Sequence, residues 1–359
     1  MEMQNSGQVN ASGRQHGWGF RCGMFIGCLL PLFGMLLLVG GCSAMFCALF
    51  SSVAGGSGEE ENVNERAVVE GGGERAVAMI RICGMITPAD SRGWSADRTE
   101  ASAPRIRRLL RKAQNDGRVA AVLLDMNTPG GEVVASDEIR KAVDDVRRAG
   151  KPVVTCIHSM GASGGYYIAS GSNWIVANRL SITGSVGVII SAYQYDGLLG
   201  KIGVKPLVYR SGKFKDILSG TREMTPEEKA YIDYMVRQSF REFCAVIAAG
   251  RPEHFADADA VLKADFANGA PLSGADALRY GLIDELGDFD AAVAKARELC
   301  GESEAPVIEY SARFSSWLDD FFSAHSGVST VRVEGMPQLP KGTGGNMNGA
   351  LFYLMPEAL

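Results

Sequence analysis

The stretch HSMGASGGYYIAS, residues 158–170, places Ser163 among small residues directly after a run typical of a buried strand. Its core, GASGG, fits the GxSxG pattern of a strand-to-helix turn that presents a nucleophilic serine. At a helix N-terminus, backbone N–H groups and the helix dipole stabilise the oxyanion that forms when a serine attacks a carbonyl carbon. The pattern predicts either an acyl-transfer nucleophile or a small-residue turn that lets a helix pack closely.

A nucleophilic serine needs a proton acceptor, and histidine is scarce in this chain. His16 precedes a long apolar stretch, His158 is five residues before Ser163, and His254 and His325 follow it. A base as near in sequence as His158 would require a sharp chain reversal. An α/β-hydrolase order ending at His325 would indicate an esterase, but that histidine lies in a turn-rich tail.

Lysine is the other candidate base, because burial disfavours its charged form and a neutral amine accepts a proton from a nearby hydroxyl. The stretch VYRSGKFKDILS, residues 208–219, offers Lys213 and Lys215. Such a pair is also typical of solvated surface, so the residues alone leave both interpretations open.

The elements around Ser163 alternate between strand and helix patterns. Apolar runs predict strands at 77–86, 119–126 and 151–157, with helices at 103–114 and 133–149 between them. Further strand-like runs are WIVAN, SVGVII and KPLVYR. A long helix is predicted over 225–251, followed by two more helices within 273–300. This alternation predicts an α/β fold with a mostly parallel sheet.

The N-terminal part indicates a membrane anchor. Residues 23–50 contain no charged residue, and about 20 apolar residues suffice for a helix to cross a bilayer. Arg14 and Arg21 precede the run and an acidic stretch follows it, so residues 1–22 are predicted to be cytoplasmic and the rest extracytoplasmic. A cleaved signal peptide, or a lipid on Cys42, is the alternative.

The remaining boundaries follow from composition. Residues 51–76 are rich in Gly, Ser and Glu and are predicted to be a flexible linker to a main domain at 77–300. Residues 301–359 are interpreted as a tail without assigned chemistry.

Composition also excludes several function classes. The net charge of −5, without a dense basic stripe, argues against nucleic-acid binding. No pair of cysteines has CxxC spacing, so a zinc site is not expected. Cys83, Cys156, Cys244 and Cys300 are scattered singly and are interpreted as buried thiols in preference to a disulfide.

Five motifs in order carry a resemblance to a known family. They are DMNTPGGEVVASDEI, MGASGGYYIAS, TGSVGVI, RSGKFKDILS and YGLIDELG. Together they resemble bacterial signal peptide peptidase A, in its shorter, single-repeat, membrane-anchored form. The resemblance covers about residues 77–300 and the N-terminal anchor. It implies a ClpP/crotonase-like spiral of ββα units preceded by one transmembrane helix.

The resemblance also implies roles for individual residues. Ser163 would be the nucleophile and Lys215, directly before the aspartate of SGKFKD, the general base. Lys213, two positions earlier on the same segment, is the competing choice.

Three further positions match the family's site. Gly131 of TPGGE would donate its N–H to the oxyanion, with Gly164 as a second donor. Ser185 of TGSVGV would hold the lysine amine. The chain departs from the common pattern at Cys83, where a polar residue is usual, and at Glu132, where a third glycine is usual. We expect the Glu132 carboxylate to point to solvent.

The implied activity is that of a membrane-anchored serine endopeptidase on the outer side of the inner membrane. The family implies short apolar peptides such as signal-peptide remnants as substrates, a homo-oligomer, and no cofactor or metal. A crotonase-fold acyl-CoA enzyme and an inactive membrane scaffold are the alternatives.

Overall fold

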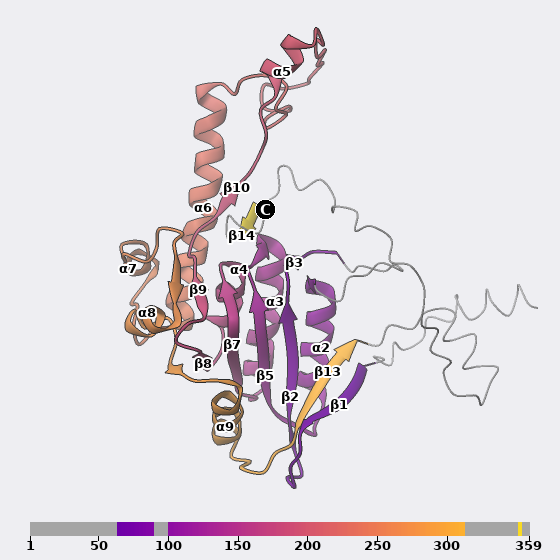
Figure 1. Ribbon diagram of the computed structural model, residues 1–359, viewed down its shortest axis with the longest axis vertical. Helices are drawn as coiled ribbons and strands as arrows, with labels where there is room; N and C mark the ends of the chain where they lie inside the picture. The colour runs from indigo at the N-terminus through magenta and orange to yellow at the C-terminus, as the bar shows by residue number, and fades with distance from the viewer. Residues whose placement is uncertain (1–62, 90–99, 313–350, 354–359) are drawn as a thin grey trace, which may run out of the picture. The chain divides into compact units, whose positions relative to one another are not determined.

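A mostly parallel β-sheet runs through the part of the chain that the structure describes (Figure 1). The structure is a computed structural model that describes residues 63–89, 100–312 and 351–353. The strands of this main sheet, in spatial order, are β1 (Val63–Val69), β13 (Val307–Ala312), β2 (Ala76–Cys83), β5 (Val119–Thr128), β7 (Val153–Ala162), β8 (Trp174–Ala177) and β12 (Glu285–Leu286). Past β7, the strand β9 (Ile182–Gly184) pairs with its C-terminal end, and β11 (Pro271–Ser273) pairs with β9.

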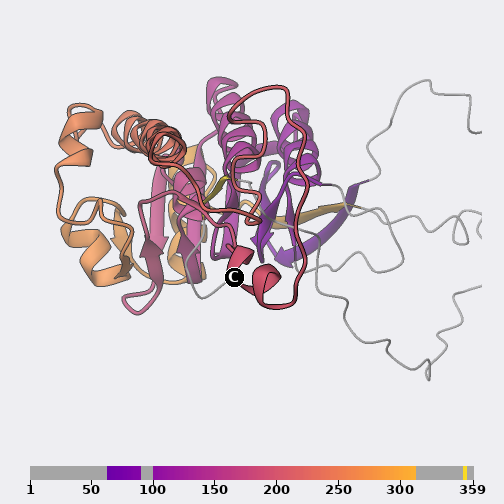
Figure 2. The same ribbon diagram turned by 90° about the horizontal axis from the view of Figure 1, so that it is seen from above.

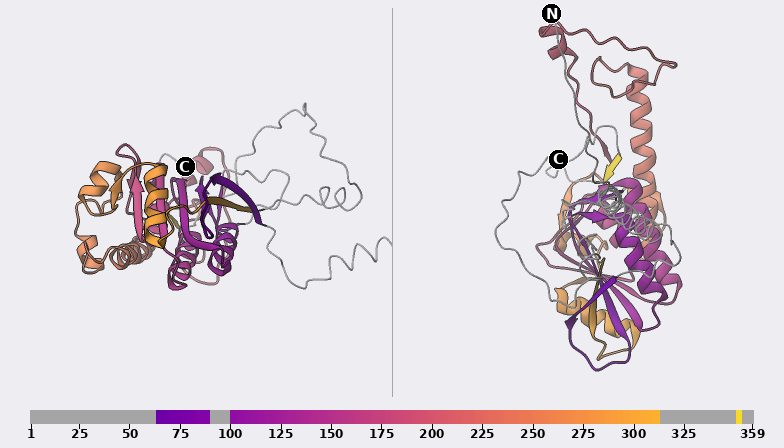
Figure 3. Two further views of the ribbon diagram at one scale, coloured as in Figure 1. Left: turned by 90° about the horizontal axis from the view of Figure 1, so that it is seen from below. Right: turned by 90° about the vertical axis from the view of Figure 1, so that its right-hand side faces the viewer.

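The central strands β2, β5 and β7 are mainly apolar because both of their faces are buried over most of their length. One face of the sheet packs on α2 (Ala103–Asn115) and α3 (Val133–Arg148), which lie side by side along it (Figure 2). The opposite face packs on α9 (Phe289–Cys300), seen in front of the strands in the left panel of Figure 3. The predicted α/β class with a parallel sheet is confirmed.

A second, smaller sheet lies at the carboxyl ends of the main strands. Its order is β10 (Ile189–Ile190), β14 (Leu351–Tyr353), β6 (Gly131–Glu132), β3 (Ile86–Thr87) and β4 (Ala101–Ser102). The chain passes from β2 through β3 and β4 to α2, and from β5 through β6 to α3. Each of these segments therefore runs from the main sheet through the second sheet to a helix, which is the order of a ββα unit.

The folded part extends beyond the predicted domain of 77–300 at both ends. Residues 63–69, which we expected within a linker, form β1 and pair antiparallel with β13. Strand β13, which we expected in the tail, pairs in parallel with β2. The predicted transmembrane segment 23–50 lies outside the described residues. Across the described ranges, no helix is long and apolar enough to cross a membrane.

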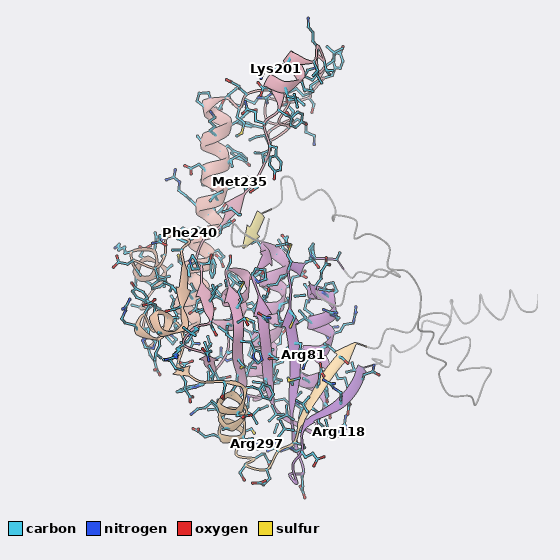
Figure 4. The ribbon with its side chains drawn as sticks, viewed as in Figure 1. Arg81, Arg118, Lys201, Met235, Phe240 and Arg297 are labelled. Carbon is cyan, nitrogen blue, oxygen red and sulfur yellow. The ribbon has the colours of Figure 1, made fainter. Side chains whose placement is uncertain are left out.

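Residues 191–239, which we call the arm, leave the sheet and return to it (Figure 3, right). The arm contains α5 (Asp196–Lys201) and the N-terminal half of α6 (Pro226–Gly250). Figure 4 labels Lys201 at its far end, Met235 partway along α6 and Phe240 where α6 reaches the body. The predicted long helix is confirmed as α6, whereas KPLVYR, which we expected as a strand, is an exposed segment without regular structure.

The helices after the arm complete the body. They are α7 (Ala258–Leu262), α8 (Gly274–Arg279) and the α9 already described, so the two helices predicted within 273–300 are confirmed. The C-terminal half of α6 joins the same core as α4 (Gly164–Ala169), because Phe243 packs edge-on against Tyr167 with ring centroids 5.2 Å apart.

Candidate active site

Ser163 occupies the turn between β7 and α4, as the GxSxG pattern predicts. Its backbone has φ 53° and ψ −118°, a conformation that non-glycine residues rarely adopt and that concentrates at functional sites. The Ser163 N–H donates to Gly184 O at 2.8 Å, and Ser163 O accepts from Tyr167 N at 2.8 Å. Strand β9 and helix α4 therefore fix the turn from both sides.

The Ser163 hydroxyl is buried and has no hydrogen-bond partner among the described residues. Buried polar groups are nearly always paired, so an unpaired one calls for an explanation such as a catalytic role. His158 is hydrogen-bonded to Asp125, and His254 lies against Gly281. Neither histidine serves Ser163, while His16 and His325 lie outside the described residues.

The glycine turn predicted to form the oxyanion hole lies beside this serine. Thr128, at the end of β5, is fully buried; its Oγ1 donates to Gly84 O at 2.6 Å and accepts from Gly130 N at 3.1 Å. A Cβ added at Gly165 would lie 2.7 Å from the Thr128 methyl carbon, so this turn packs directly on α4. The structure thus brings together the Gly130–Gly131 turn and the start of α4.

Gly131 is a glycine because β3 approaches it closely. A Cβ at this position would lie 2.6 Å from Ile86 N and closer still to Ile86 O. The Ile86 N–H donates to Gly130 O at 2.8 Å on one edge of β6. Successive peptide groups of a strand face opposite edges, so the Gly131 N–H faces away from β3, toward β14. An N–H in this position is suitable for binding an oxyanion.

Glu132 does not point to solvent as expected. It is the N-cap of α3, and its carboxylate accepts hydrogen bonds from Val134 N at 3.0 Å and Ala135 N at 2.6 Å. The first backbone N–H groups of a helix lack acceptors within it, and an acidic cap satisfies them. The negative charge is therefore engaged by α3, and glutamate at this position is compatible with an anionic transition state nearby.

Gly164 and Ser185, the other two positions implied by the resemblance, lie in different surroundings. Gly164 is the buried first residue of α4, where N–H groups have no acceptor within the helix, so it keeps the geometry expected of a second donor. Ser185 is buried with φ 50°, and its hydroxyl donates to Gly269 O at 3.0 Å. Its predicted partner Lys215 is not beside it.

Lys215 lies on the arm, and its side chain is exposed. The segment that carries it is fastened to the first turns of α6, because Phe214 stacks on Tyr231 with centroids 5.3 Å apart. Arg222 binds Asp216 at 2.8 Å and Glu228 at 2.5 Å. The segment is a series of turns and not an extended strand.

Ser163 and Lys215, the predicted nucleophile and base, are far apart within one chain. Tyr231 marks the part of α6 beside the Lys215 segment, and Phe243 marks the part that packs on Tyr167, four residues after Ser163. These positions are 12 residues apart, which at 1.5 Å per residue is about 18 Å along the helix. Lys213, the competing choice, is on the same segment and pairs with Glu227.

The four cysteines that the structure describes differ in burial. Cys83, Cys156, Cys244 and Cys300 are free thiols; Cys156 and Cys244 are buried as predicted, whereas Cys83 and Cys300 are half-buried. Burial raises the pKa of the Cys156 thiol to about 12, which removes it as a nucleophile near neutral pH. Within the described ranges no group of His, Cys, Asp or Glu side chains has the arrangement of a metal site.

Two parts of the site were not predicted. Thr128 directly precedes PGG, and a threonine that ends a buried strand before a glycine turn is a signal that could have indicated it. Strand β14 comes from the tail to which we assigned no chemistry. The apolar run ALFYLMP was its only signal in the sequence.

The chain is similar to known peptidases. Residues 145–302 match Peptidase family S49. A protein of Enterococcus faecium named for the signal peptide peptidase SppA is 32% identical over 273 residues, which cover 75% of this chain and 78% of that protein. Protease 4 of Haemophilus influenzae is 31% identical over 236 residues, which cover 65% of this chain and 36% of that protein.

Among solved structures, a variant of 1510-N, a membrane-bound stomatin-specific protease in complex with a substrate peptide, is similar to this chain with a TM-score of 0.43. The two are 19% identical, and the match covers 70% of this chain and 97% of that one.

Proposed function

This chain belongs to peptidase family S49 as an SppA-like serine protease, and from this premise we propose that Ser163 is its nucleophile and Lys215 its general base. The observation that carries the proposal is the unpaired, buried hydroxyl of Ser163 on a strained turn beside the Gly131 N–H. Strain and an unsatisfied polar group are costly in a folded protein, and both are expected where a nucleophile must stay available.

The chemistry assigns one task to each group. Ser163 Oγ attacks the peptide carbonyl carbon and passes its proton to the neutral Lys215 amine. The N–H groups of Gly131 and Gly164 stabilise the oxyanion, and a donor of this kind contributes about 10²–10³ in kcat. Lys215 returns the proton to the leaving amine, and water then hydrolyses the acyl-enzyme.

We propose further that Lys215 reaches Ser163 from a neighbouring copy of the chain. Within one chain, about 18 Å of α6 separates Tyr231, beside the Lys215 segment, from Phe243, which packs near Ser163. A lysine acts as a base only in its neutral form, which burial favours, so the exposed Lys215 has to be covered before it can serve.

The arm offers the surface for such an assembly. Large apolar side chains that are more than half exposed cluster on it: Tyr193, Leu198, Ile202, Leu207, Val208, Tyr209 and Tyr234. Exposed apolar patches of this kind indicate protein–protein contacts. A homo-oligomer would bury them and bring Lys215 of one copy to Ser163 and the neighbouring Ser185 hydroxyl of another.

The substrates that we propose are short apolar peptides such as signal-peptide remnants. The relative from Enterococcus faecium is named for cleavage of signal peptides, and residues 23–50 of this chain have the composition of a membrane anchor. An anchored enzyme and a membrane-derived peptide meet on one surface. We propose that the peptidase domain faces the extracytoplasmic side of the inner membrane.

The experiment uses three variants of the full chain and an apolar peptide ester. Ser163→Ala and Lys215→Ala should each abolish hydrolysis, whereas Lys213→Ala, the matched control on the same segment, should keep it. Co-expression of the two inactive variants should restore about one quarter of the activity, because random assembly pairs an intact serine with an intact neighbouring lysine at that frequency. Activity in Lys215→Ala alone would contradict the base assignment, and failed complementation would contradict its origin in a second copy.

A further inference from the structure

Two arginines of α3 and one at the end of α6 meet beyond the C-terminal end of α4. Arg147 Nη1 donates to Gly171 O at 2.9 Å. A Cβ added at Gly171 would lie 2.4 Å from Arg140 Nε, so this guanidinium group lies against the same glycine. Arg251 is the C-cap of α6. Burial lowers the pKa of Arg147, and the nearby charges of Arg140 and Arg251 lower it further. The three guanidinium groups therefore share one small region.

Most of the unpaired buried polar atoms in the described part of the chain belong to these three side chains. Seven buried side-chain nitrogen and oxygen atoms there have no hydrogen-bond partner, and five of them are guanidinium nitrogens of this cluster. They are Nε and Nη1 of Arg140, Nε of Arg147, and Nε and Nη2 of Arg251. The Arg140 and Arg251 side chains are only 7% and 5% exposed. Buried donors without an acceptor are rare, and a bound ion is one of the few explanations for them.

The charges of the cluster do not balance. Arg251 Nη1 donates to both carboxylate oxygens of Asp284, at 2.7 and 3.0 Å. Asp144 forms an ion pair with Arg140, and its other oxygen lies 3.8 Å from Arg147 Nη1. Three guanidinium groups thus share two carboxylates, which leaves one positive charge in a largely buried place. Burial of an uncompensated charge is costly, so a single negative charge from solution would complete the cluster.

The neutral neighbours do not supply that charge. The Tyr166 hydroxyl lies near Arg251 but donates to Leu282 O at 2.8 Å, and burial raises the pKa of Tyr166, so the hydroxyl stays protonated. The space beside Arg140 is also small, because a Cβ at Gly171 would lie 2.5 Å from the guanidinium carbon. Sulfate and phosphate are larger and more highly charged than the cluster requires. A monatomic, monovalent anion matches both the charge and the space.

We propose that Arg140, Arg147 and Arg251 bind one small monovalent anion, with chloride as the ligand of suitable charge and size. The anion would accept hydrogen bonds from α3 and α6 beside the end of α4. It would thus join the helix that follows the Gly131 turn and the helix that carries the arm to the helix that begins after Ser163. The site is structural, and the proposed hydrolysis does not depend on it.

The first test measures the thermal stability of the full chain in a neutral detergent. Sodium chloride replaces sodium gluconate at constant ionic strength, because gluconate is too large to enter the cluster. The Tm should rise with chloride and then saturate. At about ten to a hundred times the dissociation constant, ligand linkage gives a rise of about 3–8 °C for a domain of this size. A Tm that does not change with chloride would overturn the inference.

Two neighbouring arginines of α3 provide the variants. Arg147→Gln removes the unbalanced charge, so it should abolish the chloride-dependent rise. In gluconate it should melt no lower than the unchanged chain, because the repulsion among the cations is relieved. Arg148→Gln is the matched control, since Arg148 is exposed and pairs with Asp145. It should keep the full rise. An equal chloride-dependent rise in Arg147→Gln and Arg148→Gln would contradict the proposed site.

A second measurement covers the case in which Arg147→Gln misfolds. Bromide has the charge of chloride and nearly its size, and its position in a crystal is found by anomalous scattering. Crystals of the full chain soaked in sodium bromide should show a peak in contact with at least two of the three guanidinium groups. Water at this position, with bromide bound only elsewhere, would refute the anion site.

Discussion

Thr128 is predicted to position the oxyanion hole, and Thr128→Val tests this. Valine keeps the shape of threonine and its methyl contact with Gly165 but removes the hydroxyl. The buried Gly130 N–H then loses its acceptor at 3.1 Å, and Gly84 O loses a donor at 2.6 Å.

The expected loss of stability depends on how deeply each hydrogen-bond partner of the Thr128 hydroxyl is buried. An unsatisfied buried N–H costs about 1–3 kcal/mol, and the half-buried Gly84 O can turn toward water at a smaller cost. We therefore expect Thr128→Val to lower the free energy of unfolding by about 2 kcal/mol in urea denaturation. Displacement of an oxyanion donor should also lower kcat for a peptide ester about tenfold. Complete removal of such a donor lowers kcat by about 10²–10³.

Thr155→Val is the matched control. Thr155 is buried in β7, and its Oγ1 is hydrogen-bonded to Ser172 Oγ at 2.6 Å, away from the Gly130–Gly131 turn. The control should lose a similar free energy of unfolding, about 1 kcal/mol or more, and keep its kcat. A kcat for Thr128→Val equal to that of Thr155→Val would refute the positioning role, whatever the stability change.

Two other predictions concern the turn and the arm. Gly131→Ala should reduce kcat at least about 10²-fold, because the new Cβ meets the Ile86 backbone and pushes the donor away; Gly117→Ala, with nothing within 4 Å of its added Cβ, should be neutral. Hydrogen bonds from Arg222 lower the pKa of Glu228 from 4.5 to about 2, so its stabilising contribution is complete above pH 4.5 and is lost as the pH falls through about 2. Carbon-13 NMR titration should find this midpoint, and Arg222→Gln should return it toward 4.5; a wild-type midpoint near 4.5 would show that the ion pair does not hold the arm.

Much of the site could be predicted because its signals are local. A glycine-flanked serine after an apolar run specifies a strand-to-helix turn, and the structure has Ser163 there. A glycine is required at Gly131 by the close approach of one neighbouring strand, and TPGG indicates such a turn directly. The central strands and long helices are likewise specified by their own sequence patterns. A strand that is buried on both faces has a continuous apolar run, and a helix that is buried on one side has a single apolar stripe.

The parts that could not be predicted depend on contacts between distant segments. The sequence of β1, VNERAVV, has two charged residues and is mostly exposed. It becomes a strand because β13 pairs with it from 243 positions away, as the hydrogen bond between Arg66 and Glu309 shows. The separation of Lys215 from Ser163 depends on where α6 leaves the body, which no local pattern records. Strand β14 is only three residues long, too short for a pattern of its own, and it is defined by its pairing with a strand on each side.

The identity of the nucleophile is tested most directly by trapping the acyl-enzyme. The full chain is mixed with an apolar peptide ester, quenched with acid within the first turnover and mapped by mass spectrometry. We predict the acyl group on the peptide that contains Ser163, and no adduct in Ser163→Ala. An adduct on another residue, together with hydrolysis that survives in Ser163→Ala, would contradict the account.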